Sequence, residues 1–330
     1  MQRTPASLFF ELLTLLAALV YFTNASKGDR SPQFRACVGD CSRFFSSGPY
    51  LGEHQFYYPN VILFRLFQWN IVDECKYQCM HICESNLSQA STEKEPLQYF
   101  GKWPFIRVLG VQEFFSVLFS FANLFAHKYG YQKTRQTVHS EPLYKYYFIT
   151  STLTWISSAI FHSRDTRFTE FLDYFFAFAS ILFALFIAID RVFLNRRFLS
   201  SLLRRCLGLF FLWILVFHYY RMAMVAFDYS LNMKVNAVAI VLHAAVWTYW
   251  AIKHPFYFFR RKILLFILCI SLASLFEILD FPPFFGLIDA HALWHASTTF
   301  LVPLYWSFLR DEYEAANAHG ETCVLYTKML

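Results

Sequence analysis

The chain has 330 residues, of which 57% are hydrophobic and 21% aromatic, whereas only 16% are charged. Soluble domains usually carry about 25% charged residues, so this composition excludes an ordinary soluble protein and predicts a membrane protein. The net charge of +6 does not indicate a nucleic-acid partner, because the basic residues lie in short loops between apolar stretches. In such loops they determine membrane topology.

Residues 1–25 predict a cleaved signal peptide. Arg3 precedes the apolar stretch 8–20, and the segment Thr23-Asn24-Ala25 offers small residues for a cleavage site. Glu11 lies inside the apolar stretch, so an uncleaved membrane anchor is the alternative. We expect the residues from about Ser26 onward to be exported.

Residues 26–105 are expected to form a lumenal, Cys-rich region without a recognisable fold. A secretory compartment favours disulfides over metal binding by these cysteines. The region has five cysteines, an odd number, so at least one thiol stays free or pairs elsewhere. The sequence does not determine which cysteines form disulfides. Asn86-Leu-Ser88 is a glycosylation sequon, and the polar stretch 85–96 predicts a loop. The region contains Cys37, Cys41, Cys75, Cys79 and Cys83.

Seven apolar stretches follow, each close to the roughly 20 residues that cross a bilayer as a helix. Basic residues are concentrated in the connections after the first, third and fifth stretches, which places these connections in the cytosol and the N-terminal region in the lumen. We therefore predict an all-α protein with a membrane domain at 106–310 and a cytosolic tail at 311–330. The predicted spans are 108–127, 144–163, 171–190, 206–226, 235–253, 262–281 and 288–308.

Five polar residues are expected at one depth on the lumenal side. Ser158 and His162 end the second span, Asp173 begins the third, and His291 and His295 begin the seventh. Residues four positions apart share a helix face, so both pairs can point into the bundle. Ionisable residues inside a membrane are costly and usually functional, and three imidazoles at one depth predict a metal site.

Three histidine ligands with water in the fourth position are typical of catalytic zinc. Zinc lowers the pKa of its water to about 7, so we expect water rather than Ser158 to be the nucleophile. If His162 binds metal, no separate His–carboxylate pair is evident to activate Ser158. Ser158 is then an oxyanion donor, and Asp173 holds the water, acts as general base or supports a ligand. Taken singly, each residue also fits packing or helix capping. Glu277 and Asp280, near the lumenal end of the sixth span, are weaker candidates for supporting the site, because acidic residues at a helix end also serve as caps.

Several segments resemble the Per1-like family of GPI-anchor lipid-remodelling proteins, also called post-GPI attachment to proteins factor 3. The resemblance extends over nearly the whole chain. It also relates the chain to a superfamily of seven-span metal hydrolases that includes alkaline ceramidases and adiponectin-type receptors. The matching segments are Asp73-Glu-Cys75-Lys-Tyr-Gln-Cys79-Met, Gly101-Lys-Trp-Pro-Phe105, Phe161-His162-Ser-Arg-Asp165-Thr, Leu172-Asp173-Tyr174, Phe227-Asp228-Tyr229 and Leu279-Asp280-Phe-Pro-Pro283 through His295.

The resemblance implies zinc held by His162, His291 and His295, with Ser158 and Asp173 completing a catalytic centre. It implies removal of the unsaturated sn-2 acyl chain from the phosphatidylinositol of GPI-anchored proteins. The expected location is the Golgi or endoplasmic reticulum membrane, and the expected partners are GPI-anchored proteins and their lipid.

Two features leave part of this picture open. The chain has Ile71 where relatives are expected to have cysteine, and Cys83 is additional, so the disulfide pairing stays undecided. The alternative functions are a non-catalytic seven-span receptor and a chaperone for the maturation of GPI-anchored proteins. A receptor would leave the five polar residues without a chemical reason, and a chaperone would need the lumenal Cys-rich region more than the histidines.

Overall fold

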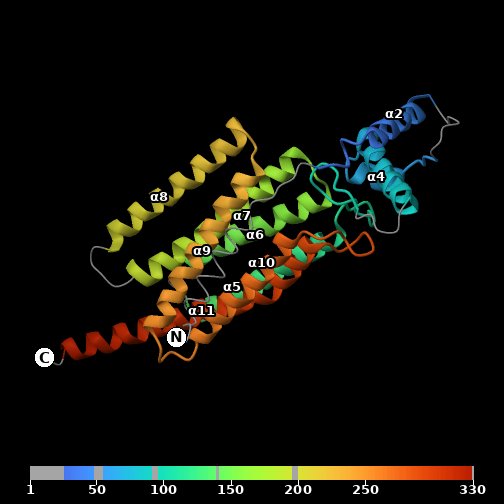
Figure 1. Cartoon of the computed structure of the whole chain (residues 1–330). Coiled ribbons are helices and arrows are strands. Elements are labelled where there is room, and N and C mark those ends of the chain that lie inside the picture. The colour runs from blue at the N-terminus through green and yellow to red at the C-terminus, as the bar shows by residue number, and fades with distance from the viewer. Residues whose placement is uncertain (1–25, 48–54, 91–95, 139–140, 195–199, 329–330) are drawn as a thin grey trace, which may run out of the picture.

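The computed structural model is built from helices (Figure 1). Within the part of the chain that it describes, β structure is limited to three isolated bridges. The expectation of an all-α protein is therefore confirmed. The predicted signal peptide lies outside the described residues, which are 26–47, 55–90, 96–138, 141–194 and 200–328.

Three helices form an N-terminal helical module, α2 (Pro32–Ser47), α3 (Val61–Leu66) and α4 (Ile71–Ala90). Cysteines one turn apart on α2 face cysteines one turn apart on α4, and two disulfides, Cys37–Cys79 and Cys41–Cys75, join the helices. Cys83 is buried and free, in agreement with the odd cysteine count. The expectation of a loop at 85–96 was partly wrong, because α4 continues to Ala90.

From Phe114 onward, the described residues form seven long helices, each overlapping one of the predicted spans. Helices α7 and α8 end in short π-helical turns, η1 (Asp190–Leu194) and η2 (Arg221–Val225). The largest shift is in the last helix, which continues to Lys328 although the predicted span ends at 308. The first helix begins six residues later than predicted, because the chain from 106 to 113 makes turns at the bundle end. The helices are α5 (Phe114–Arg135), α6 (Pro142–Ser163), α7 (Arg167–Ile189), α8 (Ser200–Tyr220), α9 (Tyr229–Lys253), α10 (Arg260–Leu279) and α11 (Ala290–Lys328).

Four of these helices are long and apolar enough to cross a membrane, so a multi-pass membrane protein is supported. They are α7 to α10, with the π-helical turns included. Helices α5, α6 and α11 fall short of that apolarity because buried polar side chains interrupt them. The prediction of seven spans stays a prediction.

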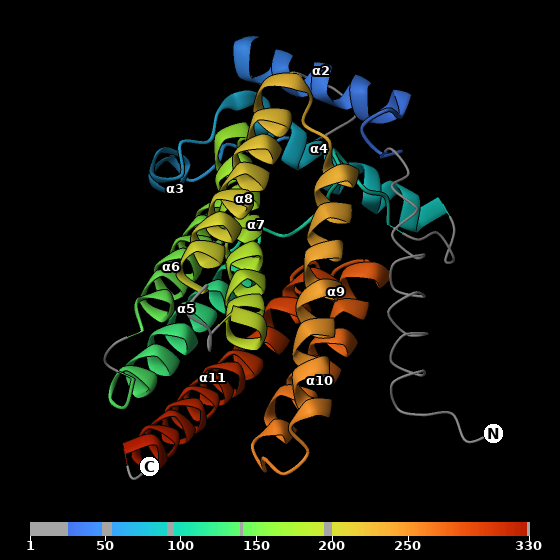
Figure 2. The same cartoon turned by 90° about the vertical axis from the view of Figure 1, so that its left-hand side faces the viewer.

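The contacts among six of the helices form a closed ring, in which α5 and α6 lie on one side and α9 and α10 on the other (Figure 2). Helix α5 packs on α6, α6 on α7, α7 on α9, α9 on α10, α10 on α11, and α11 on α5. Helix α8 lies outside this ring against α7 and is mostly exposed. Gly130 of α5 packs directly against Trp306 of α11, whose side chain occupies the space that a Cβ at this position would need.

The N-terminal helical module is attached to the end of the bundle where α6 ends and α11 begins (Figure 1). The Trp69 ring has the guanidinium of Arg107 at 3.7 Å and that of Arg164 at 5.2 Å from its centroid. Both arginines also bind acidic residues of α4, Glu74 at 2.8 Å and Asp73 at 3.1 Å. We call these five residues the tryptophan clamp; cation–π contacts of this kind contribute about 0.5–2 kcal/mol each.

Candidate metal centre

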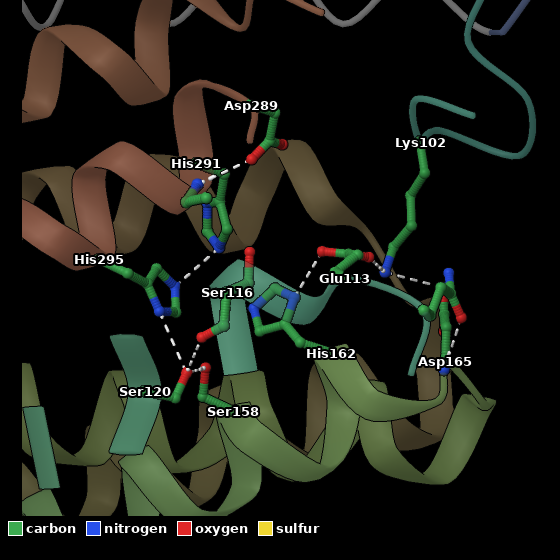
Figure 3. A network of polar contacts seen from close by, with 12 residues as sticks. Lys102, Glu113, Ser116, Ser120, Ser158, His162, Asp165, Asp289, His291 and His295 are labelled. Atoms are coloured by element: carbon green, nitrogen blue, oxygen red, sulfur yellow. Dashed lines mark hydrogen bonds and ion pairs between the residues drawn. The ribbon is translucent and has the colours of Figure 1, made fainter. Parts of the chain in front are cut away.

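Three histidines meet at this end of the bundle (Figure 3). His162 lies in the last turn of α6, and His291 and His295 lie in the first two turns of α11. One ring nitrogen from each residue can be chosen so that all three lie within 4.8 Å of one another. His162 and His295 are buried, each 2% exposed. The group can therefore hold a metal ion.

Local structure fixes the two helix ends that carry the histidines. Asp289 precedes α11, and its carboxylate accepts a hydrogen bond of 2.8 Å from the backbone N–H of Ala292. This is the interaction by which an acidic residue caps a helix N-terminus. At the end of α6, the carbonyl of His162 accepts a 3.0 Å hydrogen bond from the backbone N–H of Glu113. The segment before α5 is thereby held against the last turn of α6.

Each histidine has a partner at Nδ1. The ring of His162 meets Glu113 at 2.6 Å, that of His291 meets Glu277 at 2.8 Å, and that of His295 meets Ser120 at 3.2 Å. A carboxylate at Nδ1 selects the tautomer in which Nδ1 carries the proton and Nε2 keeps its lone pair. The arrangement leaves three Nε2 atoms as ligand atoms.

The donor set fits zinc. Tetrahedral zinc binds imidazole nitrogens at about 2.0–2.1 Å, which places two such nitrogens roughly 3.3 Å apart. The Nε2 atoms of His291 and His295 lie 2.9 Å apart. The Nε2 of His162 is buried and has no hydrogen-bond partner among the described residues. A buried nitrogen without a partner is rare, and a cation shared by the three rings would satisfy it.

A half-buried lysine links this centre to the N-terminal segment. Lys102 contacts Glu113 at 2.7 Å and Asp165 at 3.1 Å, and its ammonium lies 3.9 Å from the ring centroid of Phe161. Burial alone lowers the pKa of Lys102, but its ion pairs with Glu113 and Asp165 raise the pKa above its ordinary value. The lysine therefore stays charged and holds the carboxylate that orients His162.

The structure brings Ser158 and Asp173 to the same region. Ser158 is buried one turn before His162, and its Oγ lies 3.1 Å from the Oγ of Ser120. Asp173, in the second turn of α7, interacts electrostatically with His162 and His291. Among the described residues it has no hydrogen-bond partner. All five predicted site residues thus lie at one end of the bundle.

Sequence reasoning missed the contribution of α5. Its face toward the histidines carries Ser116, Ser120 and Asn123, whose spacing of three and four residues keeps them on one side of a helix, and Glu113 directly precedes the helix. Asn123 donates a 2.7 Å hydrogen bond to the carbonyl of His295. The signal was present in the sequence as a polar stripe through an otherwise apolar stretch.

The other acidic candidates separate into two roles. Glu277 supports His291, whereas Asp280 accepts hydrogen bonds from Trp103 at 2.9 Å and Gln98 at 2.7 Å. Asp280 lies at the end of α10, and it therefore binds the segment that follows α4. These bonds tie the N-terminal module to the bundle beside the histidines.

Comparison with known proteins identifies the family. The family model described as "Per1-like family" matches residues 61–313, which include α4 and every residue of the candidate centre. The chain belongs to the Per1-like family. Membership confirms the resemblance read from the sequence motifs.

Curated relatives cover most of the Per1-like chain. A Drosophila melanogaster protein named "Post-GPI attachment to proteins factor 3" is 38% identical over 89% of this chain and 91% of its own length. A Bos taurus protein named "GPI-specific phospholipase A2-like PGAP3" is 36% identical over 91% and 93%. "Protein PER1 homolog" of Schizosaccharomyces pombe is 32% identical over 91% and 92%. No solved structure matches the chain.

Proposed function

We propose that this protein is a zinc-dependent lipid hydrolase that removes the sn-2 acyl chain from the phosphatidylinositol of GPI-anchored proteins. The observation that carries the proposal is the histidine group, in which each Nδ1 is held by a partner and the three Nε2 atoms are left as ligands. The names of the relatives, which include a GPI-specific phospholipase A2-like protein, support the substrate class.

The proposed topology places this centre at the lumenal membrane surface. It comprises a signal peptide at 1–25, a lumenal region at 26–105, seven spans within 106–310 and a cytosolic tail at 311–330, in the Golgi or endoplasmic reticulum membrane. The alternation of basic loops supports it, as does the packing of α5, α6 and α11 in one ring with apolar helices. A GPI lipid presents its head group on that side of the membrane.

His162, His291 and His295 would hold the zinc. When bound, zinc supplies a Lewis acid for the ester carbonyl and lowers the pKa of a water to about 7. Glu113, Glu277 and Ser120 keep the three rings in the ligand tautomer, while the apolar helices accommodate the acyl chains. Burial of two of the three rings excludes bulk water from the reacting atoms.

Asp173 acts as the proton carrier in this proposal. It accepts a proton from the attacking water, whose oxygen bonds to the carbonyl carbon of the sn-2 ester. The bond between that carbon and the glycerol oxygen then breaks, and Asp173 returns the proton to the glycerol oxygen. The products are a fatty acid and a lyso-GPI lipid. Ser158 donates a hydrogen bond to the oxyanion formed between the two steps.

The test uses the purified full-length protein, its zinc content and lipid analysis of GPI anchors. His295→Ala is expected to lose both zinc and sn-2 hydrolysis. The control is His243→Gln. His243 is a half-buried histidine bonded at 3.0 Å to Tyr305, and Tyr305 lies ten residues or about 15 Å along α11 from His295. Full zinc binding and hydrolysis by His295→Ala would refute the proposal. A wild-type protein without zinc or lipid turnover would favour the chaperone or receptor alternative.

A further inference from the structure

Helix α5 presents a row of three polar residues to the histidines. Glu113, at its start, bonds to His162, and Ser120, two turns later, bonds to His295. Ser116 lies between them at the i+3 position from Glu113 and the i−4 position from Ser120. Residues with this spacing share one helix face, so Ser116 faces the same centre. Figure 3 shows its hydroxyl directed toward the three histidines.

The Ser116 hydroxyl is unusual among the buried serines of this protein. The residue is 1% exposed, and among the residues that the structure describes its Oγ has no hydrogen-bond partner. Serines in membrane helices commonly donate to the carbonyl four residues earlier, as Ser120 does to Ser116 at 2.7 Å. Ser116 makes no such bond. Buried polar groups are nearly always paired, so a group left unpaired beside a reaction centre indicates a ligand.

The hydroxyl proton of Ser158 is used in a hydrogen bond to Ser120, whereas among the described residues the hydroxyl proton of Ser116 is not used in a hydrogen bond. With Nε2 reserved for metal, Nδ1 of His295 carries a proton and donates it to the Oγ of Ser120. Ser120 donates its own proton to the carbonyl of Ser116. Ser158 then donates to Ser120, across 3.1 Å. Ser158 must give up this bond to serve a substrate, whereas the Ser116 hydroxyl has no bond to give up.

We propose that Ser116 is a second, preorganised oxyanion donor, whose hydroxyl binds the carbonyl oxygen of the substrate ester as negative charge develops on it. This inference rests on the proposed hydrolase function. Preorganised donors are effective because they need no reorganisation when the charge appears, and two donors at one oxyanion are the common arrangement. The donor requires a carbonyl in the substrate, and an acyl ester supplies one.

The first measurement compares Ser116→Ala with wild type and with Ser151→Ala. Ser151 is an equally buried serine of α6, bonded to Ser180 at 3.2 Å and eleven residues before His162, or about 16 Å along the helix. Ser116→Ala is expected to lower kcat on the order of 100–1,000-fold with little change in KM or zinc content. Ser151→Ala is expected to keep wild-type kcat. Full kcat in Ser116→Ala would overturn the inference.

The second measurement is binding, which does not depend on turnover. A phosphonate analogue of the sn-2 ester mimics the tetrahedral oxyanion, whereas the sn-2 ether analogue mimics neither the carbonyl nor its charge. Ser116→Ala is expected to weaken phosphonate binding at least tenfold and to leave ether binding unchanged. Equal weakening of both would show a packing role and overturn the inference. If wild type hydrolyses no GPI lipid while His295→Ala still loses zinc, the proposed function fails instead.

Discussion

The geometry of this site depends on the residues that bind Nδ1 of each histidine as much as on the histidines themselves. Glu113 and Glu277 fix two tautomers, and Ser120 fixes the third. Lys102 in turn holds Glu113 in place. Replacing such a partner usually lowers metal affinity tenfold to a hundredfold. This partial loss can be distinguished from the loss of zinc that is expected when a ligand is replaced.

Replacing Glu113 with glutamine is expected to weaken zinc affinity about 10–100-fold without unfolding the protein, because His162 loses its anionic partner. Competition with a chromogenic chelator measures the change. Asp311→Asn is the matched control, since Asp311 is also an ion-paired carboxylate, bonded to Lys262 at the other end of the bundle. Unchanged zinc affinity in Glu113→Gln would show that this carboxylate does not orient the ligand.

Asp173→Ala and Ser158→Ala are expected to separate proton transfer from oxyanion stabilisation. Ser158→Ala should leave measurable activity, with a loss on the order of 100–1,000-fold, whereas Asp173→Ala should lose more because the water then lacks its base. Both variants should retain zinc. Single-turnover hydrolysis measures the rates. Trapping of an acyl group on Ser158 would contradict the water mechanism and make Ser158 the nucleophile.

Among the helices, the pair α5 and α11 determines how the site is assembled. Gly130→Ala places a methyl group against the side chain of Trp306, which is fully buried between the two helices. Overpacking of this kind typically costs about 1–3 kcal/mol, so a lower melting temperature and weaker zinc binding are expected. Gly208→Ala on α8 is the control, because its new Cβ would be 3.9 Å from the nearest side-chain atom, on Phe186. Equal melting temperatures for the two variants would argue against a tight α5–α11 contact.

The sequence predicted the helices of the bundle well and those of the N-terminal module poorly. Long apolar stretches with basic connections determine the former, and all seven predicted ranges overlap a helix. The segment 71–90 lacks an apolar stripe, and two disulfides to α2 hold it against that helix instead. Their pairing depends on which faces of α2 and α4 meet, which spacing alone does not determine.

The three histidines of the candidate site were predicted from the sequence, and Glu277 was a weaker candidate for a supporting role, whereas Glu113 and Ser120 were missed. His162, His291 and His295 follow from helix ends and i, i+4 spacing. Glu113 was missed because it lies within the predicted first span, 108–127, whereas the helix begins after it. Its link to His162 depends on the turn from 106 to 113, for which the sequence pattern gives no geometry.

For the whole molecule, the proposed topology predicts two accessible sites on opposite sides of the membrane. Asn86 is exposed on α4, and glycosidase treatment should shift the mass of the mature protein if this asparagine carries a glycan. Protease added outside intact microsomes should cut the chain after 311 and leave the N-terminal module intact. Protection of the C-terminal segment together with cutting of the module would reverse the orientation.

The tryptophan clamp connects the N-terminal module to the end of α6 that carries His162. Arg164 stands two residues after His162, so the end of α6 contacts Trp69 and Asp73 on one side and the candidate ligands on the other. Linkage is reciprocal: if an attached module favours zinc binding, bound zinc must favour attachment of the module by the same factor. Zinc removal is therefore expected to increase hydrogen exchange in α4, and Trp69→Leu should abolish that response. A membrane protein with such a connection would report the state of its histidine centre through the exposure of a helix outside the bundle.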